Sequence, residues 1–297
     1  MKNSIQAFKD YLNQQDLSEI TVRGYLHDIE LFWRWVVELH GQEIDLKEIS
    51  TIDLKSYRQY LANVQNQKPS SINRKLQSVK RLFRWAQEKG LASDISQQVR
   101  FMRSSKNYQP KALSTSEVHA LFRLAGQSCH GLAKRNYALL QLMIQTGLRV
   151  SEVVKLRIGD LLINERSGCV FVRDSKGHTQ REVPLNSAAR RALTTYLQTR
   201  TLKKEDLLFH SKKGQPLSLR AVQEVITVLG RKAKLSGVSA HTLRHTFAVN
   251  YLKANQNNLV ELANLLGHQS LDTTAIYLRP AKEKLAEDLE RSSLNVY

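Results

Sequence analysis

Apolar residues recur at the spacing of an α-helix through the first hundred positions, and this periodicity constrains the fold more than any other feature of the chain. Ser18 is placed to cap a helix that runs to about position 39, and Gly41 follows as a stop. The apolar residues on one face of this helix are Tyr25, Ile29, Phe32, Trp33 and Val36.

Three more helices are predicted in the same part of the chain. A short one spans 5–12, a second is capped by Thr51, and a third opens at Pro69. The third helix turns Ile72, Leu76, Val79, Leu82 and Phe83 inward. These segments predict a small domain of four or five helices over residues 1–103.

The helix that opens at Pro69 also carries a basic stripe on its outward face. Most stripes of Lys and Arg are solvated surface, but on a strongly basic chain such a stripe can also contact DNA. Both interpretations stay open. The candidate DNA-binding residues are Arg74, Lys75, Lys80 and Arg81.

The periodicity is lost over residues 100–112, which contain Ser104, Ser105, Asn107 and Pro110. We therefore expect a linker at 104–111 and a second domain at 112–297. In that second domain Ser114 and Glu117 form a capping box before an apolar run.

The second domain mixes helices with a few short strands. Strands are predicted at 161–163, 169–172 and 182–185, joined by turns at 164–168 and 174–180. The predicted helices span 115–125, 133–146, 187–199, 218–234, 243–254, 258–266, 270–278 and 281–291. The expected fold class is mainly α with a small antiparallel β-sheet, α+β.

The charge of the chain favours a polyanionic partner. The net charge is +18 and the isoelectric point about 9.9. Residues 1–110 hold 17 Lys and Arg against 12 Asp and Glu, so most of the excess falls on the rest. Because no strongly basic amphipathic helix with an aromatic face is present, nucleic acid is favoured over an anionic membrane.

Composition also bears on the compartment. No run of about 18 apolar residues suits a membrane span, and positions 1–16 lack the apolar core of a signal peptide. Cys129 and Cys169 are interpreted as isolated, reduced thiols rather than a disulfide framework or metal cluster. We expect an intracellular, cytoplasmic protein.

Two candidate site residues lie at chain turns. Arg149 follows a glycine at a helix end, where its planar fork could face a phosphate, and Glu152 could orient it. Lys176 lies at the tip of a predicted hairpin beside Gly177. Each residue taken alone is more simply a solvated side chain.

The segment HTLRH places His241 and Arg244 on one helical face, which suggests an anion site. A zinc site through His241 and His245 is disfavoured, because Thr242 replaces the glutamate of the H-E-x-x-H motif and no third ligand is obvious. His245 is interpreted as a packed, hydrogen-bonded histidine.

Two more candidates follow toward the carboxyl end. His268 follows Gly267, which is placed as a helix C-cap. Tyr277 falls in a short helix capped by Asp272 or Thr273, where a lone tyrosine would ordinarily be core.

Taken in order, Arg149, Lys176, His241, Arg244, His268 and Tyr277 supply the groups that metal-free phosphoryl transfer needs. Arginine forks and histidine donors can stabilise charge on the equatorial oxygens of the transition state. A phenol can form a covalent phosphodiester, and an ammonium can protonate a leaving oxygen. No Asp and Glu cluster suited to Mg²⁺ accompanies them, so a two-metal nuclease route is disfavoured.

At these residues the sequence resembles the tyrosine recombinase (phage integrase) family over nearly the whole chain. TGLRVSEV, HTLRH, LLGHQS and TTAIY match the family signature in order and spacing, and Lys176 matches its hairpin lysine. The segment TVRGYLHDIELFWRW, 21–35, is similar to part of the family's core-binding domain.

The resemblance implies a role for each residue and no metal, cofactor or ATP. Tyr277 would attack the scissile phosphate and leave a 3′-phosphotyrosyl link, and Lys176 would act as general acid. Arg149 and Arg244 would clamp the phosphate, supported by Glu152. His241 would accept a proton from the reacting oxygens or bond to them, and His268 would donate to a phosphate oxygen.

The resemblance also implies an assembly. A helical core-binding (SAM-like) domain and the catalytic domain would form a C-shaped clamp on the double-stranded DNA of a core recombination site. Four protomers, identical or paired with a related recombinase, would exchange strands through a Holliday junction, with accessory proteins possible. The last helix, 281–291, would dock on a neighbouring protomer or fold back on its own domain. No membrane partner is expected.

With no insertion between Lys176 and His241, the layout looks most like Xer-type recombinases and transposon-encoded resolvases. Resolution and integration or excision, of a chromosome or a mobile element, stay open. Two other functions are considered: a type IB topoisomerase-like enzyme that relaxes DNA, and a non-catalytic DNA-binding accessory protein.

Overall fold

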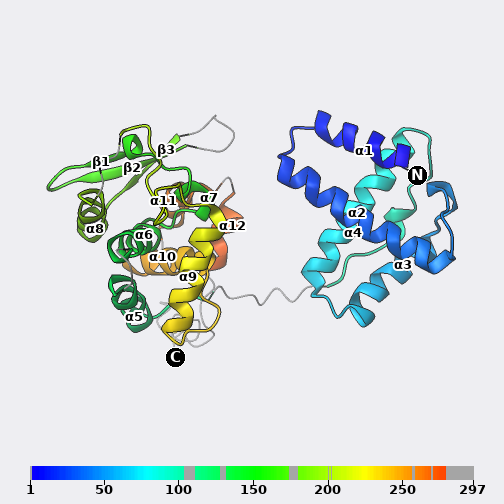
Figure 1. Cartoon of the computed structure of the whole chain (residues 1–297). Helices are drawn as coiled ribbons and strands as arrows, with labels where there is room; N and C mark the ends of the chain where they lie inside the picture. Colours follow the sequence, from blue (N-terminus) through cyan, green and yellow to red (C-terminus); the bar gives the residue numbers. More distant parts are fainter. Residues whose placement is uncertain are drawn as a thin grey trace, which may run out of the picture. The chain divides into compact units, whose positions relative to one another are not determined.

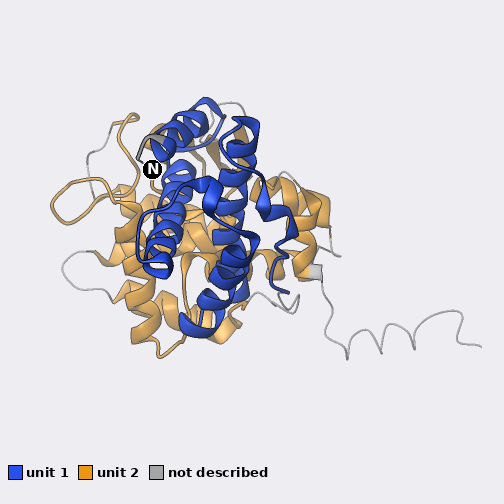
Figure 2. Cartoon of the chain, turned by 90° about the vertical axis from the view of Figure 1, so that its right-hand side faces the viewer, with its two compact units in different colours: residues 1–107 blue, residues 108–297 orange. Residues whose placement is uncertain are grey.

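The computed structural model describes residues 2–103, 111–127, 132–173, 180–199, 201, 203–255, 258–268 and 270–278. The chain divides into two compact units, residues 1–107 and 108–297 (Figures 1 and 2). Each unit has its own hydrophobic core. The linker expected at 104–111 falls almost entirely outside the described residues.

Unit 1 is helical, as the periodicity predicted. Its α-helices are α1 (Lys2–Gln14), α2 (Glu19–His40), α3 (Thr51–Gln59) and α4 (Pro69–Glu88), with short helical segments at Leu46–Glu48, Tyr60–Val64 and Ile95–Gln98. Ser18 caps α2 by accepting from the Thr21 amide, and Gly41 ends it in the left-handed conformation. The cap expected at Thr51 is wrong, because Ser50 caps α3 in a capping box with Asp53.

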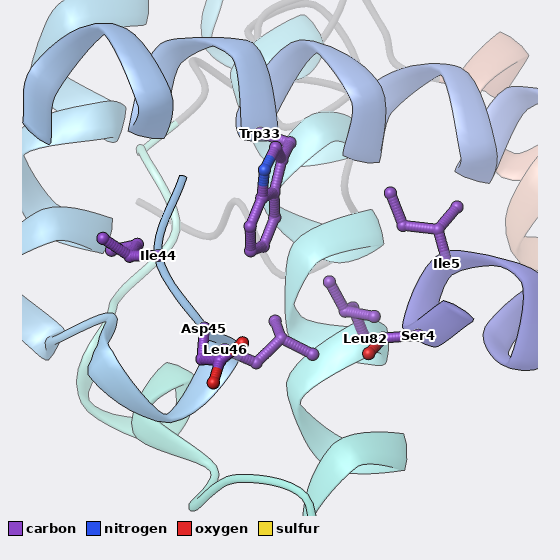
Figure 3. A pocket seen from close by; sticks show the side chains of 7 residues that line it. All are labelled: Ser4, Ile5, Trp33, Ile44, Asp45, Leu46 and Leu82. Atoms are coloured by element: carbon purple, nitrogen blue, oxygen red, sulfur yellow. The ribbon is translucent and has the colours of Figure 1, made fainter. Parts of the chain in front are cut away.

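Several aromatic side chains pack against one another in the core of unit 1. Phe32 meets Tyr57 edge to face at 5.0 Å between ring centroids, and Phe8 meets Trp85 in the same way at 5.2 Å. A small cavity lies beside this core between α1, α2 and α4, and Trp33 lines it (Figure 3).

Unit 2 combines helices with one small sheet. Its helices are α5 (Thr115–Gly126), α6 (Ala133–Thr146), α7 (Val150–Val153), α8 (Ser187–Leu197), α9 (Leu219–Lys232), α10 (Ala240–Ala254), α11 (Leu259–Leu266) and α12 (Leu271–Ala275), with short 3-10 segments at Ile158–Asp160 and Ile276–Leu278. The antiparallel sheet has the order β1 (Leu161–Ile163), β2 (Gly168–Arg173), β3 (Gln180–Pro184). The predicted α+β class is confirmed.

The sheet lies at the edge of the helical part of unit 2 (Figure 1). Val170, Val172 and Val183 are buried in the same cluster as the apolar residues of α6, α8 and α9. Helix α6 is buried along most of its length, as expected for the central helix of a bundle. A rigid centre of this kind fixes the ends of α6 and of the helices packed on it.

Three boundaries differ from the sequence prediction at the carboxyl end. Helix α10 begins at Ala240 rather than 243, because Ser239 caps it in a capping box with Thr242. Ser270, and not Asp272 or Thr273, caps α12 by accepting from an amide. The segment that holds Tyr277 continues α12 as a 3-10 turn. The expected helix 281–291 lies outside the described residues.

Candidate active site

Arg149 stands between two helices of unit 2. Gly147 ends α6 with φ of 64°, and a Cβ at that position would clash with Phe247, so the turn requires glycine. The Arg149 guanidinium donates to the carbonyls of Leu266, at 3.4 Å, and Gly267, at 3.2 Å. These oxygens form the carboxyl end of α11, which carries partial negative charge and suits a cation.

Arg244 lies in the first turns of α10 and is buried, with 4% of its surface exposed. Its guanidinium donates to the carbonyls of Gly147 and Leu266, both at 2.8 Å. Burial and the charge of Arg149 lower the pKa of Arg244 to about 10, so it remains a cation at neutral pH. The two guanidinium groups thus meet at one carbonyl, that of Leu266.

Glu152 connects Arg149 to a third arginine, Arg181. Its carboxylate accepts from the Arg149 amide at 2.7 Å and from the Arg149 guanidinium at 3.2 Å. Arg181 on β3 donates from both terminal nitrogens to the two oxygens of the same carboxylate, at 2.9 Å each. Burial alone would raise the pKa of Glu152, but the bonds and charges of Arg181 and Arg149 hold it below its usual value.

His268 connects Arg244 to α12. Its Nε2 lies 2.8 Å from the Arg244 guanidinium, and its Nδ1 lies 2.7 Å from the hydroxyl of Thr274. Since a guanidinium can only donate, Nε2 accepts and the ring proton sits on Nδ1. Burial and the nearby arginines, Arg244 first, lower the pKa of His268 to about 4, so the ring is neutral at physiological pH.

Tyr277 is joined to α10 through His245. The phenolic oxygen of Tyr277 lies 2.7 Å from Nδ1 of His245. His241, one turn earlier and exposed, lies against the His245 ring with 6.0 Å between centroids. The Tyr277 ring packs on the small cluster of Ala248, Leu252, Leu262 and Leu266. The nucleophile candidate therefore rests on the helix that carries Arg244.

The structure thus brings most of the predicted residues to one place. Arg149, Arg244 and His268 are linked directly or through one carbonyl, Glu152 supports them, and Tyr277 and His241 meet at His245. Lys176 lies outside the described residues, in the segment between the paired strand ends Arg173 and Gln180.

The arrangement is built to receive an anion. The guanidinium groups of Arg149 and Arg244 share one acceptor, the Leu266 carbonyl. Their bonds to carbonyls and to the Glu152 carboxylate use only part of the five N–H donors of each arginine. Arg149 keeps 40% of its side-chain surface exposed, which leaves room for a ligand oxygen. Across the described residues no three His, Cys, Asp or Glu side chains are grouped closely enough to hold a metal ion.

Two residues of the site were missed by sequence analysis. Arg181 gave no signal, because its partner Glu152 is 29 positions away and only strand pairing brings it near. Thr274, fully buried beneath His268, looked like one of several polar residues in a short helix. A Cβ at Gly267 would lie 2.7 Å from Arg181, so this glycine leaves room for the arginine as well as ending α11.

The candidate DNA-binding residues of unit 1 have partners of their own. Arg74 forms a bidentate ion pair with the buried carboxylate of Asp28, at 2.6 Å for each bond. Arg81 stacks over the ring of Tyr25, and Lys80 lies 5.0 Å from the centre of the Phe101 ring. Lys75 forms no ion pair among the described residues. Their contact with DNA remains a prediction.

Two family profiles match this chain. The profile of the phage integrase family matches residues 111–284, and the profile of its N-terminal SAM-like domain matches residues 5–90. No helix within the described ranges has the length and apolar character to cross a membrane.

Two curated relatives align over almost their whole length. The tyrosine recombinase XerC of Oceanobacillus iheyensis is 32% identical, with 97% of this chain and 95% of the relative covered. The TnP I resolvase of Bacillus thuringiensis is 29% identical, with 96% and 98% covered. A crystal structure of the XerH site-specific recombinase bound to a palindromic difH substrate has the same fold, with a TM-score of 0.74 at 21% identity over 92% of this chain and 80% of that one.

Proposed function

This chain belongs to the phage integrase family of tyrosine recombinases, and on that premise we propose that it is a site-specific recombinase acting on double-stranded DNA. The observation that carries the proposal is the pairing of Arg149 and Arg244 at the Leu266 carbonyl, with Tyr277 attached to the same helix as Arg244. Such a pair of cations suits a phosphodiester held for attack by a phenol.

In the proposed step the Tyr277 oxygen attacks the scissile phosphorus. The new bond is a 3′-phosphotyrosyl ester, and the bond to the 5′ oxygen breaks. Arg149 and Arg244 bind the non-bridging oxygens and stabilise the charge that develops on them. Because the ester conserves the energy of the broken bond, a free 5′ hydroxyl can reverse the step on the same or another strand.

His268 orients Arg244 in this proposal. Its neutral ring accepts from the guanidinium and donates to Thr274, so both nitrogens are occupied. Donation to a phosphate oxygen, the role that the family resemblance implies, would require one of these bonds to open. Arg149 is proposed to be positioned by Glu152, which Arg181 holds in turn.

Two further roles complete the chemistry. Lys176 is proposed as the general acid that protonates the leaving 5′ oxygen, delivered by the segment between β2 and β3. His241, exposed beside His245, is proposed to bond a reacting oxygen of the bound DNA. The proposed step uses no metal and no nucleotide cofactor.

The biological setting is proposed from charge and relatives. The net charge of +18 suits binding to the DNA backbone in the bacterial cytosol or nucleoid. Four protomers, alike or paired with a related recombinase, would join two sites through a Holliday junction. The relatives include a XerC recombinase and a resolvase. We retain both chromosome resolution and mobile-element recombination as proposed biological roles.

A plasmid assay tests this proposal. The plasmid carries two copies of the DNA site that the protein selects from a random library. Recombination should separate or invert the intervening DNA, and a plasmid without the site should keep its supercoils. Relaxation of both plasmids without recombinant product would instead identify a topoisomerase-like enzyme. Binding with neither product would identify a DNA-binding accessory protein.

A further inference from the structure

The hydroxyl of Tyr277 is engaged by a histidine outside the set of catalytic candidates. His245 Nδ1 lies 2.7 Å from the phenolic oxygen, and the two ring centroids are 5.4 Å apart at an angle of 58°. This separation is that of a strong hydrogen bond between a phenol and an imidazole. The contact joins α10 to the segment Ile276–Leu278. The two residues lie 32 positions apart in the sequence.

His268 cannot take the phenolic proton in this arrangement, because both of its ring nitrogens are engaged. The lone pair of His268 accepts from Arg244, and the opposite nitrogen carries the proton that is donated to Thr274. His241 is exposed and meets the His245 ring. His245 thus presents a ring nitrogen to the attacking oxygen within proton-transfer distance.

The surroundings of His245 favour the neutral ring, which has a lone pair that can accept a proton. His245 is half-buried, and burial together with the charges of His241 and Arg244 lowers its pKa below the usual 6.5. Within the described residues, the titratable groups that act on His245 are these two residues of its own helix and Tyr277 from the adjoining segment. The same surroundings make the protonated ring a stronger acid, which suits return of the proton during religation.

We propose that His245 is a catalytic residue that takes the phenolic proton of Tyr277 as its oxygen attacks the phosphate. The proton moves from the phenolic oxygen to Nδ1 while the oxygen–phosphorus bond forms, and the 5′ oxygen leaves with a proton from the general acid. In religation each transfer reverses. This inference rests on the proposed function, since it assigns a group to the same strand-cleavage step.

The test compares His245→Asn with His241→Asn on a nicked DNA that traps the covalent product. An asparagine at 245 can still accept a hydrogen bond from the phenol but cannot take its proton. We expect His245→Asn to bind DNA as the native protein does and to cleave about 100-fold more slowly or worse. With 2,3,5-trifluorotyrosine at position 277, which ionises without help, cleavage by this variant should recover.

His241→Asn is the matched comparison, one turn away on the same helix. It should show no such recovery, because His241 does not receive the phenolic proton. Equal recovery in both variants, native-like cleavage by His245→Asn, or faster cleavage by it would each overturn the proposal. The last result would mean that His245 merely restrains Tyr277 at rest.

Failure of the inference is separable from failure of the proposed function. If the native protein forms no covalent product on DNA that it binds, the recombinase proposal fails. If the native protein forms the product but His245→Asn cleaves at the native rate or faster, or recovers no more than His241→Asn does, only the role of His245 fails. Should His245→Asn unfold, as judged by circular dichroism, His245→Gln is the second variant for the same comparison.

Discussion

Arg181 and Glu152 form a bidentate ion pair, with guanidinium and carboxylate atoms 2.9 Å apart on both prongs. Arg181 also donates through Nε to the carbonyl of Leu265 at 2.9 Å. Strand β3 is thereby connected to the carboxyl end of α11 and, through Glu152, to Arg149. Arg181 thus helps to fix the position of Arg149, which is proposed to bind a phosphate oxygen.

Replacing Arg181 should therefore impair cleavage without weakening DNA binding. In Arg181→Lys the bidentate bond is lost and Glu152 no longer holds Arg149 in a fixed position. A displacement of this kind costs about 100-fold in rate when the reacting groups must align. Covalent cleavage of a trapping substrate gives the rate, and fluorescence anisotropy gives the affinity.

Arg190→Lys is the control for this variant, since Arg190 in the same unit donates to the Leu185 and Glu165 carbonyls. It should cleave at nearly the native rate. Equal cleavage by the Arg181 and Arg190 variants would show that the ion pair has no part in positioning Arg149.

Thr274 should matter through His268. In Thr274→Val the shape is kept, but the Nδ1 proton of His268 loses its acceptor, and a buried donor left unpaired costs about 1–3 kcal/mol. We expect a lower free energy of unfolding and slower cleavage, because Arg244 loses a fixed partner. Urea unfolding and the trapping assay measure the two effects. Thr273→Val, exposed at the neighbouring position, should change neither.

Arg74 should act as a structural residue and Lys75 as a DNA contact. Asp28 is fully buried, so Arg74→Met removes its charged partner and leaves the Ser78 hydroxyl as the remaining described donor to this carboxylate. Because more than half of the Arg74 side chain is exposed, we expect a loss of about 1–2 kcal/mol in unfolding free energy, well below that of a fully buried pair.

Lys75→Met should leave stability within about 0.5 kcal/mol of native. It should lower the slope of log affinity against log salt by about one. Urea unfolding and binding at several salt concentrations check both variants. Native stability in Arg74→Met would contradict the structural role of Arg74. An unchanged salt slope in Lys75→Met would contradict the DNA contact of Lys75.

Lys176 is assigned to the leaving group, and a chemical substitution tests the assignment. Lys176→Ala should cleave ordinary DNA slowly, by a factor of about 100 or more. A substrate with sulfur in place of the scissile 5′ oxygen releases a thiolate, which needs no proton. Cleavage of that substrate should be nearly equal for the variant and the native protein. A persistent difference on the sulfur substrate would place Lys176 in another role.

Local sequence signals predicted much of this fold. Strand β1 has the limits expected for 161–163, and α6 those expected for 133–146, because apolar patterning and glycines act locally. The cap of α12 was mispredicted because three residues, Ser270, Asp272 and Thr273, can each accept from an amide. Spacing alone does not choose among them.

Contacts across the chain were beyond local signals. His245 was interpreted as a packed histidine, since its partner Tyr277 lies 32 positions away. Arg74 was grouped with a basic stripe that faces either solvent or DNA, because nothing in the sequence marks Asp28, 46 positions earlier, as buried. The candidate catalytic residues and the supporting Glu152 were identified by their order and spacing, whereas Arg181 and Thr274 were identified only by the fold.

The central claim is that Tyr277 forms a covalent bond with DNA, and one gel measures it. The substrate carries the selected site with a nick placed so that the released fragment diffuses away. Native protein and Tyr277→Phe, which keeps the ring but lacks the oxygen, are incubated with it in EDTA and run under denaturing conditions. The account predicts a protein–DNA band for the native chain and none for the variant, with equal DNA binding. A covalent band from Tyr277→Phe, or no band from native protein on DNA that it binds, would contradict it.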